Sequence, residues 1–166
     1  PQRHAQINNY ERGQQRMASD QPTNTDRRTR SKERMAGLVT SRNETLALYS
    51  DLASNRPYKA GDQTEEMVRR FCQALVDYAA TAHFQLYRYI VENKERRQAV
   101  LELAEQVYPQ IAATTDAILD FNDRYDVAPL ETRIGNLADD LSQLGELLAD
   151  RIQLEDQVIE ALDGGR

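Results

Sequence analysis

The sequence predicts an all-α protein built as an antiparallel four-helix bundle. Long stretches of the chain carry apolar residues three or four positions apart, which is the spacing of amphipathic helices. Glycine and proline are few, with seven Gly and five Pro in 166 residues. Alternating apolar and polar runs, which are typical of strands, do not appear. Helices that are each apolar along one stripe bury those stripes most simply against one another.

The first two helices are expected over about residues 26–54 and 64–93. Asp62 or Thr64 is placed to cap the second helix, because their side-chain oxygens can accept from free backbone N–H groups. The apolar stripe of the first helix contains Met35, Leu38, Val39, Leu46, Tyr49 and Leu52. The stripe of the second contains Val68, Phe71, Leu75, Ala79, Ala82, Leu86 and Ile90.

The third helix is expected over about residues 95–125, with a kink or a restart at Pro109. The fourth follows Pro129 and ends at Gly164-Gly165. Its heptad-like seam contains Leu130, Ile134, Leu137, Leu141, Leu144 and Leu148. The connections between the predicted helices are all short, so neighbouring helices are expected to pack antiparallel.

The chain is expected to divide into a polar segment, residues 1–25, and a bundle domain, residues 26–163. The polar segment is rich in Gln, Asn and Arg and holds few apolar anchors. We interpret it as a mobile tail or a loosely attached helix.

Charge is unevenly divided along a chain whose net charge is −6. Residues 1–34 hold eight Arg and Lys against four Asp and Glu, a net of +4, whereas residues from 101 onward hold 15 acidic and 4 basic residues, a net of −11. An acidic surface repels DNA and attracts a basic protein partner, although it also simply keeps a protein soluble. Direct DNA binding by the basic start is not favoured, because its arginines are scattered among acids.

Several classes of protein are disfavoured by composition. No apolar run reaches the roughly 18–20 residues that span a bilayer, and the first residues lack the apolar core of a secretory signal, so a cytoplasmic chain is expected. One cysteine and two histidines argue against a metal site or a disulfide framework. No phosphate loop, nucleophile elbow or zinc-protease motif is present, so we expect neither an enzyme nor a cofactor.

Three polar residues fall on or near the predicted core stripes. Continuing the seam of the fourth helix places Arg151 and Glu155 there, and His83 lies in line with Ala79 and Leu86. A lone buried charge is costly, so these groups are expected to pair in an internal polar cluster that includes His83 or a tyrosine. Such a cluster usually specifies packing, although it can also form the base of a binding cleft.

A second face of the helix over 64–93 combines an acid with an aromatic residue. Asp77, Thr81, Phe84 and Arg88 share this face, with Phe84 two turns after the carboxylate. If it is exposed, Phe84 can anchor a partner helix that carries arginine and leucine. The alternative is that the first helix covers Phe84.

These same residues belong to a longer pattern that resembles the Rsd/AlgQ family of bacterial anti-sigma factors. The matching segments are FCQALVDY at 71–78, AHF at 82–84, YPQI at 108–111, FNDRY at 121–125 and LGELL at 144–148. The resemblance extends over about residues 34–162, and the segment before about Arg30 has no recognised counterpart.

The resemblance implies a helical bundle that binds region 4 of the primary sigma factor and favours alternative sigma factors, typically in stationary phase. It also implies HPr and SpoT as further partners. Asp77 matches a carboxylate that pairs with a sigma arginine, and Phe84 matches the apolar anchor beside it. His83, Arg151 and Glu155 match family residues near a polar cavity. The predicted partner surface contains Asp77, Thr81, Phe84, Arg88, Met35 and Leu38. It departs from the family on the first helix, where the family often shows an aromatic residue and this chain has Arg34, Met35, Leu38 and Val39.

Two other functions remain open from sequence. One is a ligand- or metal-sensing bundle built around His83, Glu155 and neighbouring tyrosines. The other is a regulator of a different enzyme, such as a phosphotransfer or stringent-response protein, that binds through the same acidic face.

Overall fold

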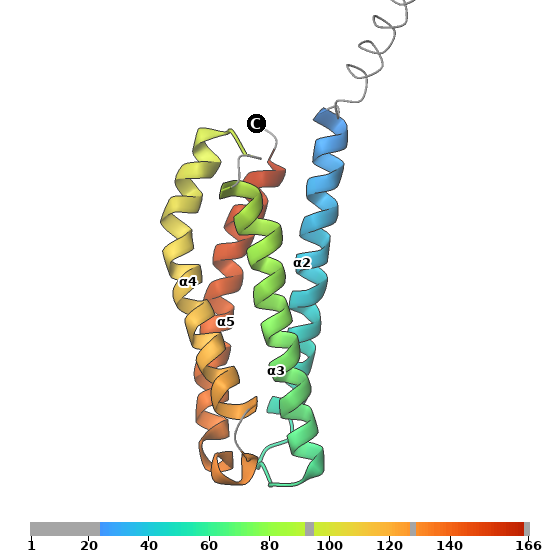
Figure 1. Ribbon diagram of the computed structural model, residues 1–166, viewed down its shortest axis with the longest axis vertical. Helices are drawn as coiled ribbons and strands as arrows, with labels where there is room; N and C mark the ends of the chain where they lie inside the picture. The colour runs from blue at the N-terminus through green and yellow to red at the C-terminus, as the bar shows by residue number, and fades with distance from the viewer. Residues whose placement is uncertain (1–23, 92–94, 127–128, 165–166) are drawn as a thin grey trace, which may run out of the picture. The chain divides into compact units, whose positions relative to one another are not determined.

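Four long helices form the part of the chain that the structure, a computed structural model, describes: residues 24–91, 95–126 and 129–164. They are α2 (Asn24–Ala53), α3 (Asp62–Ala82), α4 (Gln98–Asp126) and α5 (Ile134–Asp163) (Figure 1). A π-helical turn, η1 (His83–Tyr87), continues α3, and a 3-10 turn, η3 (Leu130–Thr132), precedes α5. The described residues contain no strand, so the predicted all-α class is confirmed.

The chain divides into two units, residues 1–33 and 34–166. Helix α2 crosses this boundary, and its residues from Arg34 onward belong to the second unit together with α3, α4 and α5. The predicted tail covers residues 1–25, of which residues 1–23 lie outside the described part of the chain. Its separation from the bundle domain therefore stays a prediction.

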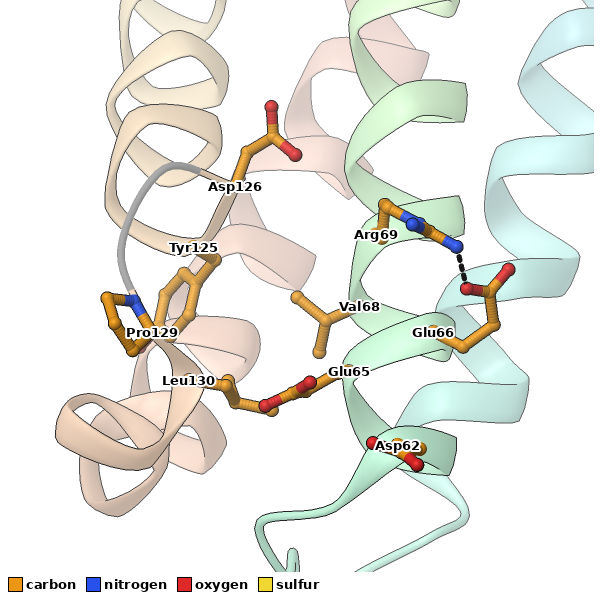
Figure 2. Close-up of a pocket in the computed structure, with 9 residues that line it drawn as sticks. All are labelled: Asp62, Glu65, Glu66, Val68, Arg69, Tyr125, Asp126, Pro129 and Leu130. Carbon is orange, nitrogen blue, oxygen red and sulfur yellow. Dashed lines mark hydrogen bonds and ion pairs between the residues drawn. The ribbon is translucent and has the colours of Figure 1, made fainter.

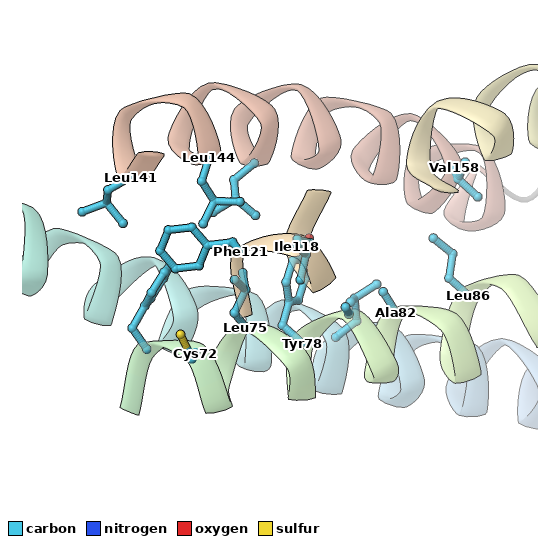
Figure 3. Close-up of a cluster of buried hydrophobic side chains, with 14 of the residues drawn as sticks. Cys72, Leu75, Tyr78, Ala82, Leu86, Ile118, Phe121, Leu141, Leu144 and Val158 are labelled. Atoms are coloured by element: carbon cyan, nitrogen blue, oxygen red, sulfur yellow. The ribbon is translucent and has the colours of Figure 1, made fainter. Parts of the chain in front are cut away.

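The predicted seam of α5 lies in the core. Leu137, Leu141, Leu144 and Leu148 are all buried, because steps of three and four residues return to the same side of a helix. Figure 3 shows Leu141 and Leu144 of this seam facing apolar side chains of α3 and α4, among them Leu75, Ile118 and Phe121. Helix α4 packs against both α3 and α5.

Side-chain hydrogen bonds and ring contacts attach α2 to the other helices. The Tyr49 ring meets Phe71 edge-on, with ring centroids 5.8 Å apart, and its hydroxyl donates to the Leu141 carbonyl at 3.0 Å. The Thr45 hydroxyl lies 3.1 Å from the Ala74 carbonyl of α3. Gly145 permits this packing, because a Cβ there would lie only 2.8 Å from Tyr49 Cζ.

Of the kink or restart predicted at Pro109, the restart is wrong. Helix α4 continues through this position from Gln98 to Asp126. Proline lacks an N–H, so the Glu105 carbonyl one turn earlier receives no hydrogen bond from residue 109. Pro109 and Glu105 are both exposed, where water can satisfy that carbonyl and the cost of the proline is reduced.

The single cysteine provides a test of core packing. Cys72 is buried, and desolvation raises the pKa of its thiol to about 12, so the thiol is protonated at neutral pH. We expect no measurable reaction with Ellman's reagent at neutral pH over minutes in the folded protein, and one equivalent of released thiolate dye in urea. Rapid reaction of the folded protein would contradict the packing of α3 described above.

Candidate functional site

The outward face of α3 carries a large exposed aromatic residue. Phe84 is 57% exposed, so the part of α2 that belongs to the second unit, from Arg34 onward, does not cover it. Asp77 lies two turns earlier on the same face and is also exposed. The Arg88 guanidinium carbon lies 5.6 Å from the centre of the Phe84 ring, which is cation–π distance.

Phe84 belongs to the π-helical turn that ends α3. The backbone N–H of Arg88 donates to the carbonyl of His83, five residues earlier, which widens this turn. The rings in and beside it touch one another: His83 stacks on Tyr87 at 5.3 Å, and Tyr87 meets Tyr108 of α4 at 4.6 Å. π turns are rare in proteins, and those that occur are often found at functional sites. This turn therefore marks the aromatic group as a candidate site.

An ion pair is buried in the bundle core. Arg151 is 1% exposed and Glu155 is 0% exposed. Arg151 Nε donates to Glu155 Oε2 at 3.1 Å, and its Nη1 donates to the hydroxyls of Thr115 at 2.7 Å and Thr114 at 3.1 Å. The Tyr78 hydroxyl donates to the other oxygen of Glu155. The cluster of Arg151, Glu155, Tyr78, Thr114 and Thr115 thus joins α3, α4 and α5.

Helix α2 completes this buried cluster. Arg42 Nη1 lies 3.7 Å from Glu155 Oε1 and donates to Asp156 at 2.7 Å. Burial raises the pKa of the Glu155 carboxyl above its usual value, while the Arg151 and Arg42 charges and the hydrogen bonds from Tyr78 and Arg151 act in the opposite direction. Since these polar groups already bond one another across all four helices, the cluster is suited to specifying how the helices pack.

Two grooves flank the outward face of α3. One lies between α2 and α3, has a volume of about 210 Å³ and includes Asp77, Glu44 and Leu48. The other lies between α3 and α4, has a volume of about 870 Å³ and is mostly apolar. Phe84 and His83 belong to this larger groove.

A separate pocket lies where α3 begins. Its volume is about 360 Å³. Figure 2 shows residues that line it, among them Asp62, Glu65 and Asp126. Arg69 also lines this pocket, but it is paired with Glu66. The pocket is therefore acidic and adds to the negative field of the surface.

Comparison with known proteins identifies the family. The protein-family model described as "Regulator of RNA polymerase sigma(70) subunit, Rsd/AlgQ" matches residues 17–163. The chain belongs to this family. Relatives named "Regulator of sigma D" include one from Enterobacter sp. (strain 638), 35% identical over 130 residues, 74% of this chain and 76% of its own. Another, from Yersinia enterocolitica, is 33% identical over 125 residues, 72% of this chain and 74% of its own.

The Escherichia coli (strain K12 / DH10B) relative of the same name is 34% identical over 125 residues, 71% of this chain and 76% of its own. A search of solved structures finds no significant match. The family match begins at residue 17, earlier than the resemblance noted from sequence, and so includes residues before Arg30. None of the helices described here is long and apolar enough to span a membrane.

Three predicted site residues do not lie where the sequence analysis placed them. Met35 and Leu38 are core residues, 4% and 0% exposed, so their side chains are not available to a partner. His83 is exposed and stacks on Tyr87 instead of joining the polar cluster. Ala82 takes the core position, because the stripe continues from Ala82 to Leu86 in a step of four through the widened turn and leaves His83 on its flank.

The other predicted residues lie where the helix spacing puts them. Arg151 and Glu155 do pair inside the bundle, and the tyrosine that joins them is Tyr78. Asp77, Phe84 and Arg88 are exposed, whereas Thr81 is half-buried. No group of three or more His, Cys, Asp or Glu in the described residues is arranged to hold a metal ion, so the metal-sensing alternative gains no support there.

Tyr87, Tyr108 and Val91 were not predicted from the sequence as partner-binding residues, although all three line the larger groove. Their spacing places them on the flanks of amphipathic helices, where sequence does not distinguish a groove from a covered surface. The run of aromatic residues from His83 to Tyr89 was the available signal.

Proposed function

We propose that this protein is an anti-sigma factor that binds region 4 of the primary sigma subunit through the outward face of α3. The observation that carries the proposal is the exposed Phe84 ring with the exposed Asp77 carboxylate two turns away on the same helix face. Membership of the sigma-regulator family supports sigma as the target. A protein with this target works in the cytoplasm.

Phe84 would supply apolar area and Asp77 would supply charge recognition. A ring that is 57% exposed can bury more than half of its surface when a partner covers it, and aromatic residues of this kind often dominate binding energy. Asp77 can accept hydrogen bonds from an arginine of a basic DNA-binding module. The net charge of −6 would speed the encounter with such a module.

The proposed mechanism is occlusion and involves no catalysis. Region 4 is the part of sigma that contacts the promoter and core polymerase, so a protein seated on it would block both contacts. Inhibition should then be stoichiometric, because each inhibitor molecule holds one sigma molecule. Turnover of any substrate is not required.

Calorimetric titration of the whole chain with purified sigma region 4 tests this function. We expect one-to-one binding, with an affinity that falls when salt is raised from about 50 to 300 mM, because the Debye length shrinks over this range. HPr and SpoT are titrated in parallel as the other partners implied by the resemblance. Absence of binding to region 4 at both salt concentrations would overturn the proposal.

A further inference from the structure

The groove between α3 and α4 collects most of the large apolar side chains exposed on the described surface. Five such residues are exposed, and four of them line this groove: Phe84, Tyr87, Val91 and Leu119. Contiguous apolar surface of this kind is uncommon on a monomer unless something binds to it. Arg151 and Glu155 lie at its base, but both are buried and paired with each other.

The shape of the groove indicates the size of what it holds. One wall extends from Val76 of α3 through η1 to Val91, and the α4 wall extends from Glu105 to Leu119, which corresponds to roughly 20 Å of helix at 1.5 Å per residue. The groove has a volume of about 870 Å³ and lies between two neighbouring helices. That length matches about four turns of a third helix laid along it.

The exposed charges of the groove lie on one wall. Glu105 and Asp116, both exposed, line the α4 side, whereas no carboxylate of α3 lines it. These two carboxylates are three turns apart on one helix, about 16 Å. Pro109 lies between them and also lines the groove.

We propose that this groove docks an amphipathic helix of a partner protein, with an apolar stripe toward the groove floor and basic residues three turns apart facing α4. The stripe would cover Tyr87, Val91 and Leu119, as in other helix-in-groove complexes. The basic residues would pair with Glu105 and Asp116 and would fix the direction in which the helix lies. This site goes beyond the proposed sigma contact, and Phe84 is the one residue that both share.

Fluorescence anisotropy with the whole chain and a labelled 18-residue helical peptide tests the proposal. The peptide carries leucines at helical spacing and lysines 11 positions apart on one flank. Two control peptides have the same residues in scrambled order, or glutamate in place of lysine. We expect at least tenfold tighter binding of the first peptide than of the scrambled one.

Protein variants locate the binding site. Ala112→Arg, at an exposed position that lines the groove, should weaken peptide binding at least tenfold because the arginine fills the groove. Asp116→Lys should weaken binding of the lysine peptide about three- to fivefold and should strengthen binding of the glutamate peptide. Asp150→Lys makes the same change in charge at an exposed position of α5 and should alter neither affinity. Asp77→Ala should bind the peptide as the parent does, because Asp77 belongs to the proposed sigma contact and does not line this groove. The two proposals can therefore fail independently of each other.

Three results would overturn the proposal. The first is equal binding of the ordered and scrambled peptides, and the second is unchanged peptide binding by both Ala112→Arg and Asp116→Lys. The third is a dimer in sedimentation velocity that Ala112→Arg dissociates, which would assign the groove to a second copy of this chain. Circular dichroism checks that each variant keeps the helical content of the parent.

Discussion

Replacing Arg151 with methionine is expected to destabilise the folded protein by about 3–5 kcal/mol, because the change leaves the Glu155 carboxylate buried without its main partner. Arg151 is 1% exposed and makes its ion pair with Glu155 at 3.1 Å. It also donates to Thr115 at 2.7 Å, so a bond between α4 and α5 is lost too. Urea unfolding followed by circular dichroism measures the difference.

The double variant Arg151→Met/Glu155→Met shows how much of the loss in stability comes from an unpaired buried charge and how much from lost packing. It should be less destabilised than the sum of the two single variants, because no unpaired charge remains in the core. Arg69→Met breaks an exposed pair with Glu66 and should change stability by no more than about 0.5 kcal/mol. A loss below about 1 kcal/mol in Arg151→Met would contradict burial of the pair.

The loss in Arg151→Met should also depend on pH. Burial already raises the pKa of Glu155, and removal of the arginine raises that pKa further. A carboxyl with a raised pKa in the folded state stabilises the protein below its unfolded pKa of about 4.3, and this contribution is lost as pH rises through the folded pKa. The difference between variant and parent should therefore be larger at about pH 7 than at about pH 4.5.

Replacing Phe84 with alanine is expected to weaken binding to sigma region 4 by about 2 kcal/mol or more, roughly thirtyfold in Kd. The ring is 57% exposed, so its removal forfeits area that a partner would bury, while little is lost from the core of the free protein. Calorimetric titration gives the affinity, and thermal unfolding should show almost unchanged stability.

Asp77→Ala should weaken the same complex less and should flatten its dependence on salt, because it removes a charged contact at the edge of the apolar anchor. Leu147→Ala is the matched control for Phe84→Ala, since Leu147 is an exposed apolar residue on α5 outside this face. It should leave the affinity unchanged. If Phe84→Ala and Asp77→Ala both bind region 4 as the parent does, the proposed surface is wrong.

The helices could be predicted from the sequence because their signal is local. Steps of three and four residues put Leu137, Leu141 and Leu144 on one side of a helix whatever surrounds it, and all three are buried. The same spacing carried Arg151 and Glu155 into the core, where the cost of a lone charge made their pairing predictable.

Contacts between helices decided what the sequence left open. Spacing showed that Phe84 shares a face with Asp77, but only the positions of α2 and α4 determine that this face is uncovered, whereas Met35 and Leu38 are covered. The π turn over His83–Tyr87 is a backbone feature that residue spacing does not encode, and His83 in it is exposed. By itself the sequence therefore determined the helices, the core stripe and the buried pair, because these follow from periodicity along one chain segment. The tertiary structure decided the groove and the exposed anchor, because these depend on which neighbouring helix covers each face.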